Sequence, residues 1–279
     1  MQPRINDEAP EINPDHHSSI IAAIERTYTR EGRDASGTYS IEGTRLVERA
    51  VGSGQAILRI ALGQAFGGSE RERLLLEMLP ADVEPQVLDE VDMRRLTGER
   101  DYGRIIALLP LPESTRLADR PVPPRVLLVA DGIRDPGNLG AMIRTGLASW
   151  ADGLLAIGVS DPWHPKAVRT SMGSLFKLPV YVADHANAAI EEVKALGYTC
   201  IGSCPAGETD LSELQLDAGP VALFMGSESF GLVESVREQM DQRVRIPMPD
   251  GVDSFSVNAA TAVLLHEIRK QGIPAVPGN

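Results

Sequence analysis

The chain has 279 residues, 43% of them hydrophobic and 24% charged, with two cysteines and a formal net charge of −12 at pH 7. The length suits two ordinary domains, and the near-average composition argues against wholesale disorder and against a disulfide scaffold. The acidic balance excludes a basic, sequence-blind coat on nucleic acid. The lack of a membrane-length apolar stretch or a signal peptide predicts a cytoplasmic protein without membrane contact.

The first part of the chain alternates helical and strand-like patterns. Residues 1–17 are polar and are expected to form a flexible tail. The apolar spacing then predicts, in chain order, a helix over 18–32, a strand over 37–43, a helix over 44–54, a strand over 56–63, a helix over 70–79 and a strand over 105–110. This alternation is typical of a small α/β/α sandwich. Prolines and charges crowd residues 109–125, so we predict a linker there and a domain boundary near residue 120.

The second part alternates more regularly. Apolar strands are predicted over 125–131, 153–158, 178–183, 198–203, 221–226 and 243–248. Helical patterns follow at 186–197, 231–241 and 257–272. Strands with continuous apolar runs are buried on both faces, so the pattern predicts a parallel sheet covered by helices.

Three loops rich in Gly, Ser and Asn each follow the end of a predicted strand. They are "DPGNLGAMIRTG" at 135–146, "GSESFGL" at 226–232 and "PMPDGVDSFSVN" at 247–258. The first lacks both the GxGxxG spacing and the GK[ST] ending of phosphate-binding loops. Because ligands of open parallel sheets bind beyond the carboxyl ends of strands, the three loops predict one composite pocket.

Each loop also has a simpler interpretation. Its glycines are then ordinary turn residues, Asn138 is a turn residue and Arg144 is a solvated charge on a helix. Some of its polar residues then cap the helices that follow, namely Ser227, Ser229, Asp253 and Ser254. The simpler interpretation does not explain why all three loops occur together.

The loops carry a resemblance to a known family. "NLGAMIRT", "FMGSESFGL" and "RVRIPMPDGVDSFSVNAATAVLLHE" resemble the three ordered motifs of the SpoU (TrmH) class of RNA ribose 2′-O-methyltransferases in the SPOUT superfamily. The resemblance covers about residues 124–272, including "VRTSMGSLFKLPV" at 168–180, and "GTYSIEGTRLVERAV" resembles a ribosomal-protein-L30e-like domain. The predicted fold is therefore α/β, with an L30e-like α/β/α RNA-binding domain over 1–120 and a parallel-sheet SPOUT domain with a deep trefoil knot over 121–279.

The resemblance implies a cofactor and an assembly. Members of the class bind S-adenosylmethionine (AdoMet) in the loops of the knot, and two copies pack together so that each active site draws on both chains. A homodimer without a metal is therefore expected. Carried onto this sequence, the cofactor site consists of Met225, Gly226, Gly231, Ile246, Met248 and Phe255, with Ser254 nearby.

The resemblance also implies the catalytic residues. Arg144 corresponds to the arginine of the first motif, which acts at the target ribose, and Asn138 and Glu228 accompany it. A guanidinium gives up a proton very reluctantly, so we favour a grip on the adjacent phosphate and on the developing alkoxide over general-base catalysis. The third motif usually reads SLNV but is "SFSV" here, with Ser256 at the asparagine position and Asn258 two residues later. The roles of Ser254, Ser256 and Asn258 therefore stay open.

The predicted activity is AdoMet-dependent 2′-O-methylation of structured RNA, with ribosomal RNA such as 23S preferred over tRNA. A non-catalytic RNA-binding or ribosome-assembly protein is the main alternative, and a nucleotide-dependent oxidoreductase is a distant third. Cys200 and Cys204 lack the third cysteine of a radical-AdoMet cluster, and ordinary buried thiols are expected. Three arginines of the first part are candidates for RNA contact: Arg33, Arg45 and Arg49.

Overall fold

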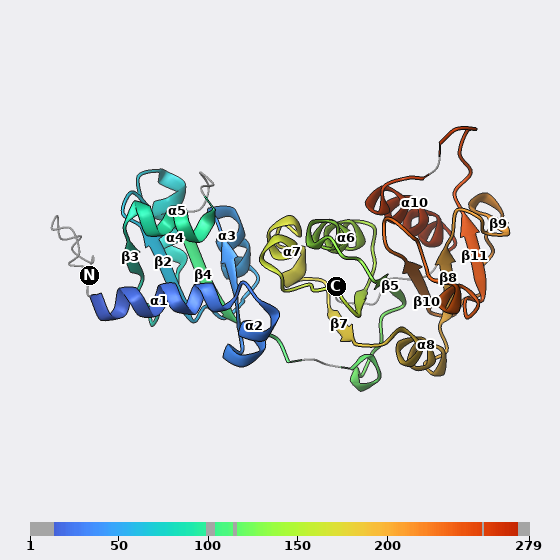
Figure 1. Ribbon diagram of the computed structural model, residues 1–279, viewed down its shortest axis with the longest axis horizontal. Helices are drawn as coiled ribbons and strands as arrows, with labels where there is room; N and C mark the ends of the chain where they lie inside the picture. Colours follow the sequence, from blue (N-terminus) through green and yellow to red (C-terminus); the bar gives the residue numbers. More distant parts are fainter. Residues whose placement is uncertain (1–13, 99–103, 114–115, 253, 273–279) are drawn as a thin grey trace. The chain divides into compact units, whose positions relative to one another are not determined.

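The structure, a computed structural model, describes residues 14–98, 104–113, 116–252 and 254–272 (Figure 1). The chain divides into two compact units, residues 1–111 and 112–279, and the division falls inside the proline-rich segment 109–125. Helix α1 begins at Pro14, so residues 14–17 are helical, and the remainder of the expected tail lies outside the described residues. Asp253 lies outside them as well.

The first unit contains a four-stranded mixed sheet in the order β1-β4-β2-β3. Strand β4 runs antiparallel to both β1 and β2, and β3 runs parallel to β2. Its helices are α1 (Pro14–Arg26), α2 (Arg30–Ser36), α3 (Thr44–Gly52), α4 (Glu70–Met78) and α5 (Glu90–Thr97). Its strands are β1 (Thr38–Glu42), β2 (Arg59–Gly63), β3 (Gln86–Leu88) and β4 (Ile105–Pro110).

Both faces of the first sheet are covered. On β4, Ile106 and Leu108 pack with buried residues of α1 and α5, and the alternating Ile105 and Ala107 are buried on the opposite face. Side chains of a strand point alternately to its two faces, so a strand buried along its whole length needs cover on both sides. The expected alternation of helices and strands is therefore present, with β3 and α5 in addition to the predicted elements. The single helix predicted over 18–32 is instead two helices, because α1 ends at Arg26 and α2 begins at Arg30.

The candidate arginines of the first unit differ in exposure. Arg33 is only 2% exposed, and its Nη1 donates a hydrogen bond to the carbonyl oxygen of Thr27 at 2.8 Å. Arg45 and Arg49 are exposed on α3. Arg33 therefore serves the interior of the unit, and its burial argues against it as a candidate for RNA contact, whereas Arg45 and Arg49 stay candidates.

The second unit contains a seven-stranded sheet in which every pair of neighbours is parallel, in the order β7-β6-β5-β10-β8-β11-β9. Its strands are β5 (Val126–Asp131), β6 (Gly153–Ile157), β7 (Val180–Ala183), β8 (Thr199–Ser203), β9 (Thr209–Asp210), β10 (Val221–Met225) and β11 (Gln242–Arg245). Its α-helices are α6 (Pro136–Ala148), α7 (Pro165–Thr170), α8 (Ala186–Ala195), α9 (Glu234–Arg237) and α10 (Val257–Lys270), and short 3₁₀ helices lie at Leu117–Asp119, Ser174–Phe176 and Leu211–Glu213. The parallel sheet predicted from the apolar runs is confirmed.

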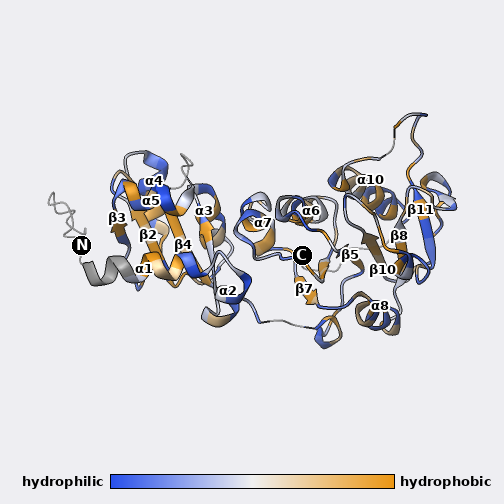
Figure 2. Cartoon of the chain, in the orientation of Figure 1, coloured by the Kyte–Doolittle hydropathy of each residue, from blue (hydrophilic) through white to orange (hydrophobic). Residues whose placement is uncertain are grey.

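Helices cover the two faces of this sheet. Leu127 and Val129 of β5 belong to a core cluster with residues of α8 and α9, whereas Leu128 between them faces α6, where it lies close to Gly146. Helix α10 packs against α6. The inner strands are hydrophobic along their length (Figure 2) because both faces are buried.

The sheet is more polar toward its β9 edge. Strand β11 is mainly hydrophilic (Figure 2), and Arg243 and Arg245 pair with Glu208 and Asp210. Charged side chains near a sheet edge disfavour pairing with another chain.

In the described parts of the chain, no helix has the length and apolar character needed to cross a membrane.

Candidate functional site

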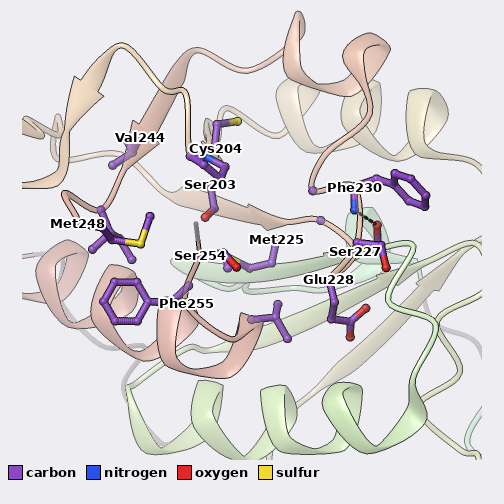
Figure 3. A pocket seen from close by; sticks show the side chains of 17 residues that line it. Ser203, Cys204, Met225, Ser227, Glu228, Phe230, Val244, Met248, Ser254 and Phe255 are labelled. Carbon is purple, nitrogen blue, oxygen red and sulfur yellow. Dashed lines mark hydrogen bonds between the residues drawn. The ribbon is translucent and has the colours of Figure 1, made fainter. Parts of the chain in front are cut away.

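A cavity of about 360 Å³ opens beyond the carboxyl ends of three neighbouring strands, β10, β8 and β11 (Figure 3). This size is within the usual range for small-ligand sites. The second and third predicted loops form most of its wall, and the start of α10 completes it. The lining residues are Ser203, Cys204, Pro205, Met225, Gly226, Ser227, Glu228, Ser229, Phe230, Gly231, Val244, Ile246, Met248, Ser254, Phe255, Val257 and Ala260.

At Gly226, the backbone of the second loop comes so close to Gly231 and Leu232 that only glycine fits. A Cβ atom there would lie 2.1 Å from the carbonyl carbon of Gly231 and 2.2 Å from the amide nitrogen of Leu232. Ser227 and Gly231 close the loop with two backbone hydrogen bonds of 3.1 and 2.8 Å, and Gly231 has a φ of 64°. The loop is therefore a tight, preformed turn on one side of the cavity.

Neither serine of the second loop caps the next helix. Helix α9 begins at Glu234 after Val233, without a side-chain cap. The hydroxyl oxygen of Ser227 instead accepts a hydrogen bond from the backbone N–H of Phe230 at 3.3 Å (Figure 3). The simpler interpretation of this loop, in which Ser227 or Ser229 caps a helix, is wrong.

The third loop leads from β11 into α10. Ile246, Met248, Ser254 and Phe255 line the cavity on this side. Ser256 is the N-cap of α10, and its hydroxyl oxygen accepts a hydrogen bond from the backbone N–H of Ala259 at 3.3 Å. The cap is thus Ser256 and not Ser254, which leaves Ser254 at the cavity wall.

The segment predicted as the first loop, residues 135–146, is helix α6 preceded by its N-cap Asp135, so the loop prediction is wrong there; Asn138, in the first turn of α6, connects this helix to the other two loops. Its side-chain Nδ2 donates to Glu228 Oε1 at 2.7 Å, and its Oδ1 accepts from Asn258 Nδ2 at 3.5 Å. Its backbone N–H donates to Asp135 Oδ1 at 2.9 Å, which caps α6. Lys166 pairs with Asp135 at 2.6 Å, and this hydrogen bond is the main cause that holds the pKa of Asp135 below its usual value. A series of hydrogen-bonded polar side chains therefore connects α7 and α6 with the cavity wall and with α10.

Arg144 is not one of these connected polar side chains. It is exposed on α6, six residues after Asn138, and is not among the described residues that line the cavity. Side chains separated by six positions on a helix do not share a face. The cavity of a single chain therefore includes Glu228 but not the arginine predicted to act with it.

The predicted site residues divide into three groups. All six predicted cofactor residues line the cavity, together with Glu228 and Ser254. Asn138 and Asn258 do not line the cavity themselves. Asn138 donates a hydrogen bond to the lining residue Glu228, and Asn258 donates one to Asn138. Arg144 and Ser256 lie outside the lining. The segment predicted as the first loop thus supports the cavity, and none of its residues lines the wall.

Sequence analysis missed one segment of the wall. Ser203, Cys204 and Pro205 line the cavity at the carboxyl end of β8. Burial is the main cause that raises the pKa of the Cys204 thiol, which keeps it neutral near pH 7. The signal was present, because Ser203 ends the predicted strand 198–203, Cys204 and Pro205 follow it, and residues 202–207, GSCPAG, are themselves rich in Gly and Ser.

The chemistry of the wall limits the ligand. Among the lining residues that the structure describes, none is Lys or Arg and the only charged one is Glu228. A pyrophosphate would therefore find no cationic partner there, whereas a cationic or neutral ligand with apolar parts would fit. In the described part of the chain, no group of His, Cys, Asp or Glu side chains could hold a metal ion.

Comparison with known proteins assigns the family. The model of the SpoU rRNA Methylase family matches residues 125–266, which contain the whole sheet and the cavity. The chain belongs to this SpoU family. A 23S rRNA (guanosine-2′-O-)-methyltransferase, RlmB of Pseudomonas syringae, is 31% identical over 76% of this chain and 78% of its own length. RlmP of Bacillus subtilis, a 23S rRNA (guanosine(2553)-2′-O)-methyltransferase, is 28% identical over 88% of this chain and 93% of its own length.

Solved structures agree with the SpoU assignment. The SpoU methyltransferase AviRb of Streptomyces viridochromogenes, in complex with AdoMet, has a TM-score of 0.81 at 25% identity and covers 92% of this chain and 99% of its own. An RNA 2′-O ribose methyltransferase has a TM-score of 0.76 at 31% identity and covers 90% of this chain and 95% of its own. The similarity thus extends over both units and beyond the region that the family model matches.

Proposed function

We propose that this chain transfers a methyl group from AdoMet to the 2′-hydroxyl of a ribose in 23S rRNA. The observation that carries the proposal is the cavity of a SpoU-family chain, lined by the second and third motif loops, with Glu228 at its wall held by Asn138 of the first motif. Relatives named as 23S rRNA 2′-O-methyltransferases support the choice of RNA. Such a substrate would place the reaction in the cytoplasm.

The cavity suits AdoMet. Its wall offers backbone amides and carbonyls around Gly226 and Ile246, and apolar side chains such as Met248 and Phe255 to cover a flat heterocycle. Glu228 carries the only charge among the described residues of the lining, which favours a cationic sulfonium over a phosphate-bearing cofactor. AdoMet supplies an activated methyl group, and the residues of the chain bind and orient the two reactants.

Asn138 and Glu228 position the acceptor side of the site. The hydrogen bond from Asn138 Nδ2 fixes one oxygen of the Glu228 carboxylate, which leaves the other oxygen free to accept a proton or a hydrogen bond. Asn258 donates to the Oδ1 of Asn138, and its own Oδ1 is buried without a partner among the described residues. An unsatisfied buried acceptor is costly, so we assign Asn258 Oδ1 to a donor brought by substrate or by a second chain.

Arg144 acts in a homodimer. It is exposed on α6 and lies outside the wall of its own cavity, so a second copy that packs against α6 and α10 would receive it in the facing site. There the guanidinium grips the phosphate next to the target ribose and stabilises the developing alkoxide. The deep trefoil knot expected for the second unit belongs to the same proposal.

The first unit serves as the RNA-binding domain. It has the α/β/α alternation expected for an L30e-like domain, and Arg45 and Arg49 are exposed together on α3. Because the chain is acidic overall, such local arginine pairs are where phosphate contacts are expected.

The test is transfer of labelled methyl from AdoMet into unmodified 23S rRNA and tRNA, followed by alkaline hydrolysis. A 2′-O-methyl group blocks cleavage at its own linkage, so label is expected in alkali-resistant dinucleotides from 23S rRNA. Arg144→Ala is expected to lower turnover about 100-fold or more while AdoMet binding by calorimetry is retained. Label in mononucleotides would show base methylation instead, label in tRNA alone would show the other substrate, and tight AdoMet binding without transfer would favour a non-catalytic protein.

A further inference from the structure

Phe230 is the most exposed large hydrophobic side chain among the described residues, with 79% of its surface accessible. It nevertheless lines the cavity at its mouth. An exposed apolar residue far from a site needs no explanation, but a large aromatic ring at the opening of a reactant cavity indicates contact with a ligand.

The loop that carries Phe230 holds its backbone in place. The bridge between Ser227 and Gly231 closes the turn, and the Phe230 N–H donates to the Ser227 hydroxyl at 3.3 Å. Fixing an aromatic group before binding reduces the entropy that binding must overcome. Phe230 is therefore held out toward solvent on a preformed support.

The position of the ring separates it from the cofactor end of the cavity. Figure 3 shows Met248 and Phe255 on one side and Glu228 with Phe230 on the other, and the Phe230 ring points away from Met248 and Phe255. Phe255 is 45% exposed and sits on the third loop. Of these two aromatic residues, Phe230 is the one beside the carboxylate that Asn138 holds.

Charge limits what can hold RNA at this mouth. None of the described lining residues of a single chain is cationic, so the chain that forms the cavity offers no phosphate contact there beyond the one proposed for the partner's Arg144. Unpaired RNA bases stack on aromatic side chains, and such stacking does not require charge. A ribose whose 2′-hydroxyl approaches the cavity carries its base, and the base of the next nucleotide, past the rim.

We propose that Phe230 is a stacking platform for an unpaired RNA base, either that of the methylated nucleotide or that of its neighbour. This inference rests on the proposed function and adds a contact that selects single-stranded or splayed nucleotides at the site. Phe230 thus contributes to RNA binding and to the orientation of the acceptor, and it does not contribute to AdoMet binding.

The experiment compares Phe230→Ala, Phe230→Tyr and Phe230→Trp in the full chain, with Val233→Ala as the matched control. Val233 is 54% exposed, lies three residues further along and does not line the cavity. With unmodified 23S rRNA transcript as the probe, Phe230→Ala is expected to raise the KM for RNA about tenfold. The aromatic variants and the control are expected to stay within about twofold of the parent chain, and the AdoMet dissociation constant and the molecular mass in solution are expected to stay unchanged.

Three results would overturn the proposal: an unchanged KM for RNA in Phe230→Ala, a loss of AdoMet affinity in that variant, or a change in its oligomeric state. The Phe230→Trp fluorescence gives a second readout, because stacking of a base is expected to quench the new tryptophan when transcript is added and AdoMet is present. Absence of that quenching also contradicts the proposal. Failure of the parent chain to transfer methyl would instead count against the proposed function, and the binding readouts still decide the role of Phe230.

Discussion

The two sides of the cavity are built on different principles. On the side of Met248 and Phe255, the wall consists of apolar side chains and backbone from the ends of β8, β10 and β11. On the side of Glu228, a carboxylate is held by Asn138, which lies in the first turn of α6, 90 residues earlier in the chain. The first side depends on local backbone geometry and the second on a contact between distant segments. Substitutions should therefore separate cofactor binding from turnover.

The backbone side is the more sensitive to a single added methyl group. Gly226→Ala would place its Cβ within 2.1–2.3 Å of backbone atoms of Gly231 and Leu232, so the loop must move. We expect AdoMet binding to be lost and the free energy of unfolding to fall by about 1–3 kcal/mol. Calorimetry and urea denaturation measure the two effects. Gly219→Ala is the control, because no atom lies within 4 Å of a Cβ there, and equal behaviour of the two variants would contradict the explanation.

The polar side should show its effect in turnover. Asn138→Ala and Glu228→Gln are each expected to lower kcat by about 10- to 100-fold. AdoMet affinity should change little in Asn138→Ala and should fall in Glu228→Gln, which removes the charge that favours the sulfonium. In the double variant the loss should be smaller than the product of the single losses, since the two side chains share one hydrogen bond. The exposed pair Asn187 and Gln239 provides a control cycle away from the cavity, with no expected effect on kcat. If the loss of kcat in the double variant equals the product of the two single losses, Asn138 and Glu228 act independently.

Substitutions of Ser256 and Asn258, both at the start of α10, should affect different properties: stability for Ser256 and turnover for Asn258. Ser256→Ala removes an N-cap, so the free energy of unfolding is expected to fall by about 1 kcal/mol while kcat stays near that of the parent. Ser256→Asn keeps a good cap and should keep the stability. Asn258→Ala should instead lower kcat, because it frees the Oδ1 of Asn138. A large loss of kcat in Ser256→Ala would move Ser256 from the helix cap to the reaction.

The smallest expected effect is on stability at alkaline pH and concerns the buried thiol of Cys200 on β8. Burial raises the pKa of Cys200 from 9.0 to about 11, so the unfolded chain releases this proton first as the pH rises. Stability linked to Cys200 is therefore complete below about pH 9 and decreases between about pH 9 and pH 11. Urea midpoints at about pH 8 and about pH 10 should fall less in Cys200→Ala than in the parent chain. An equal fall in both would place the alkaline sensitivity elsewhere.

Local patterns were sufficient for most elements and for the cofactor side. Continuous apolar runs predicted β5, β6, β7, β8 and β10, because strands covered on both faces must be apolar throughout. Strand β11, Gln242–Arg245, is polar and only overlaps the apolar strand predicted over 243–248. The short β3 and β9 were missed, since two or three residues carry too little periodicity. The helix predicted over 231–241 is only Glu234–Arg237, because the closed turn at Ser227–Gly231 and the extended Val233 delay its start.

By itself, the sequence determined the α/β class, the parallel sheet of the second unit and two of the segments that line the cavity, the second and third loops, because each depends on residues close together in the chain. The tertiary structure decided three further features: the contact of Asn138 with Glu228, the burial of Arg33 and the placement of Cys204 in the wall. It also decided that Ser256, at the position of the motif asparagine, caps a helix. These features depend on which strand ends become neighbours, and strand order follows from the packing of whole elements and not from any one motif.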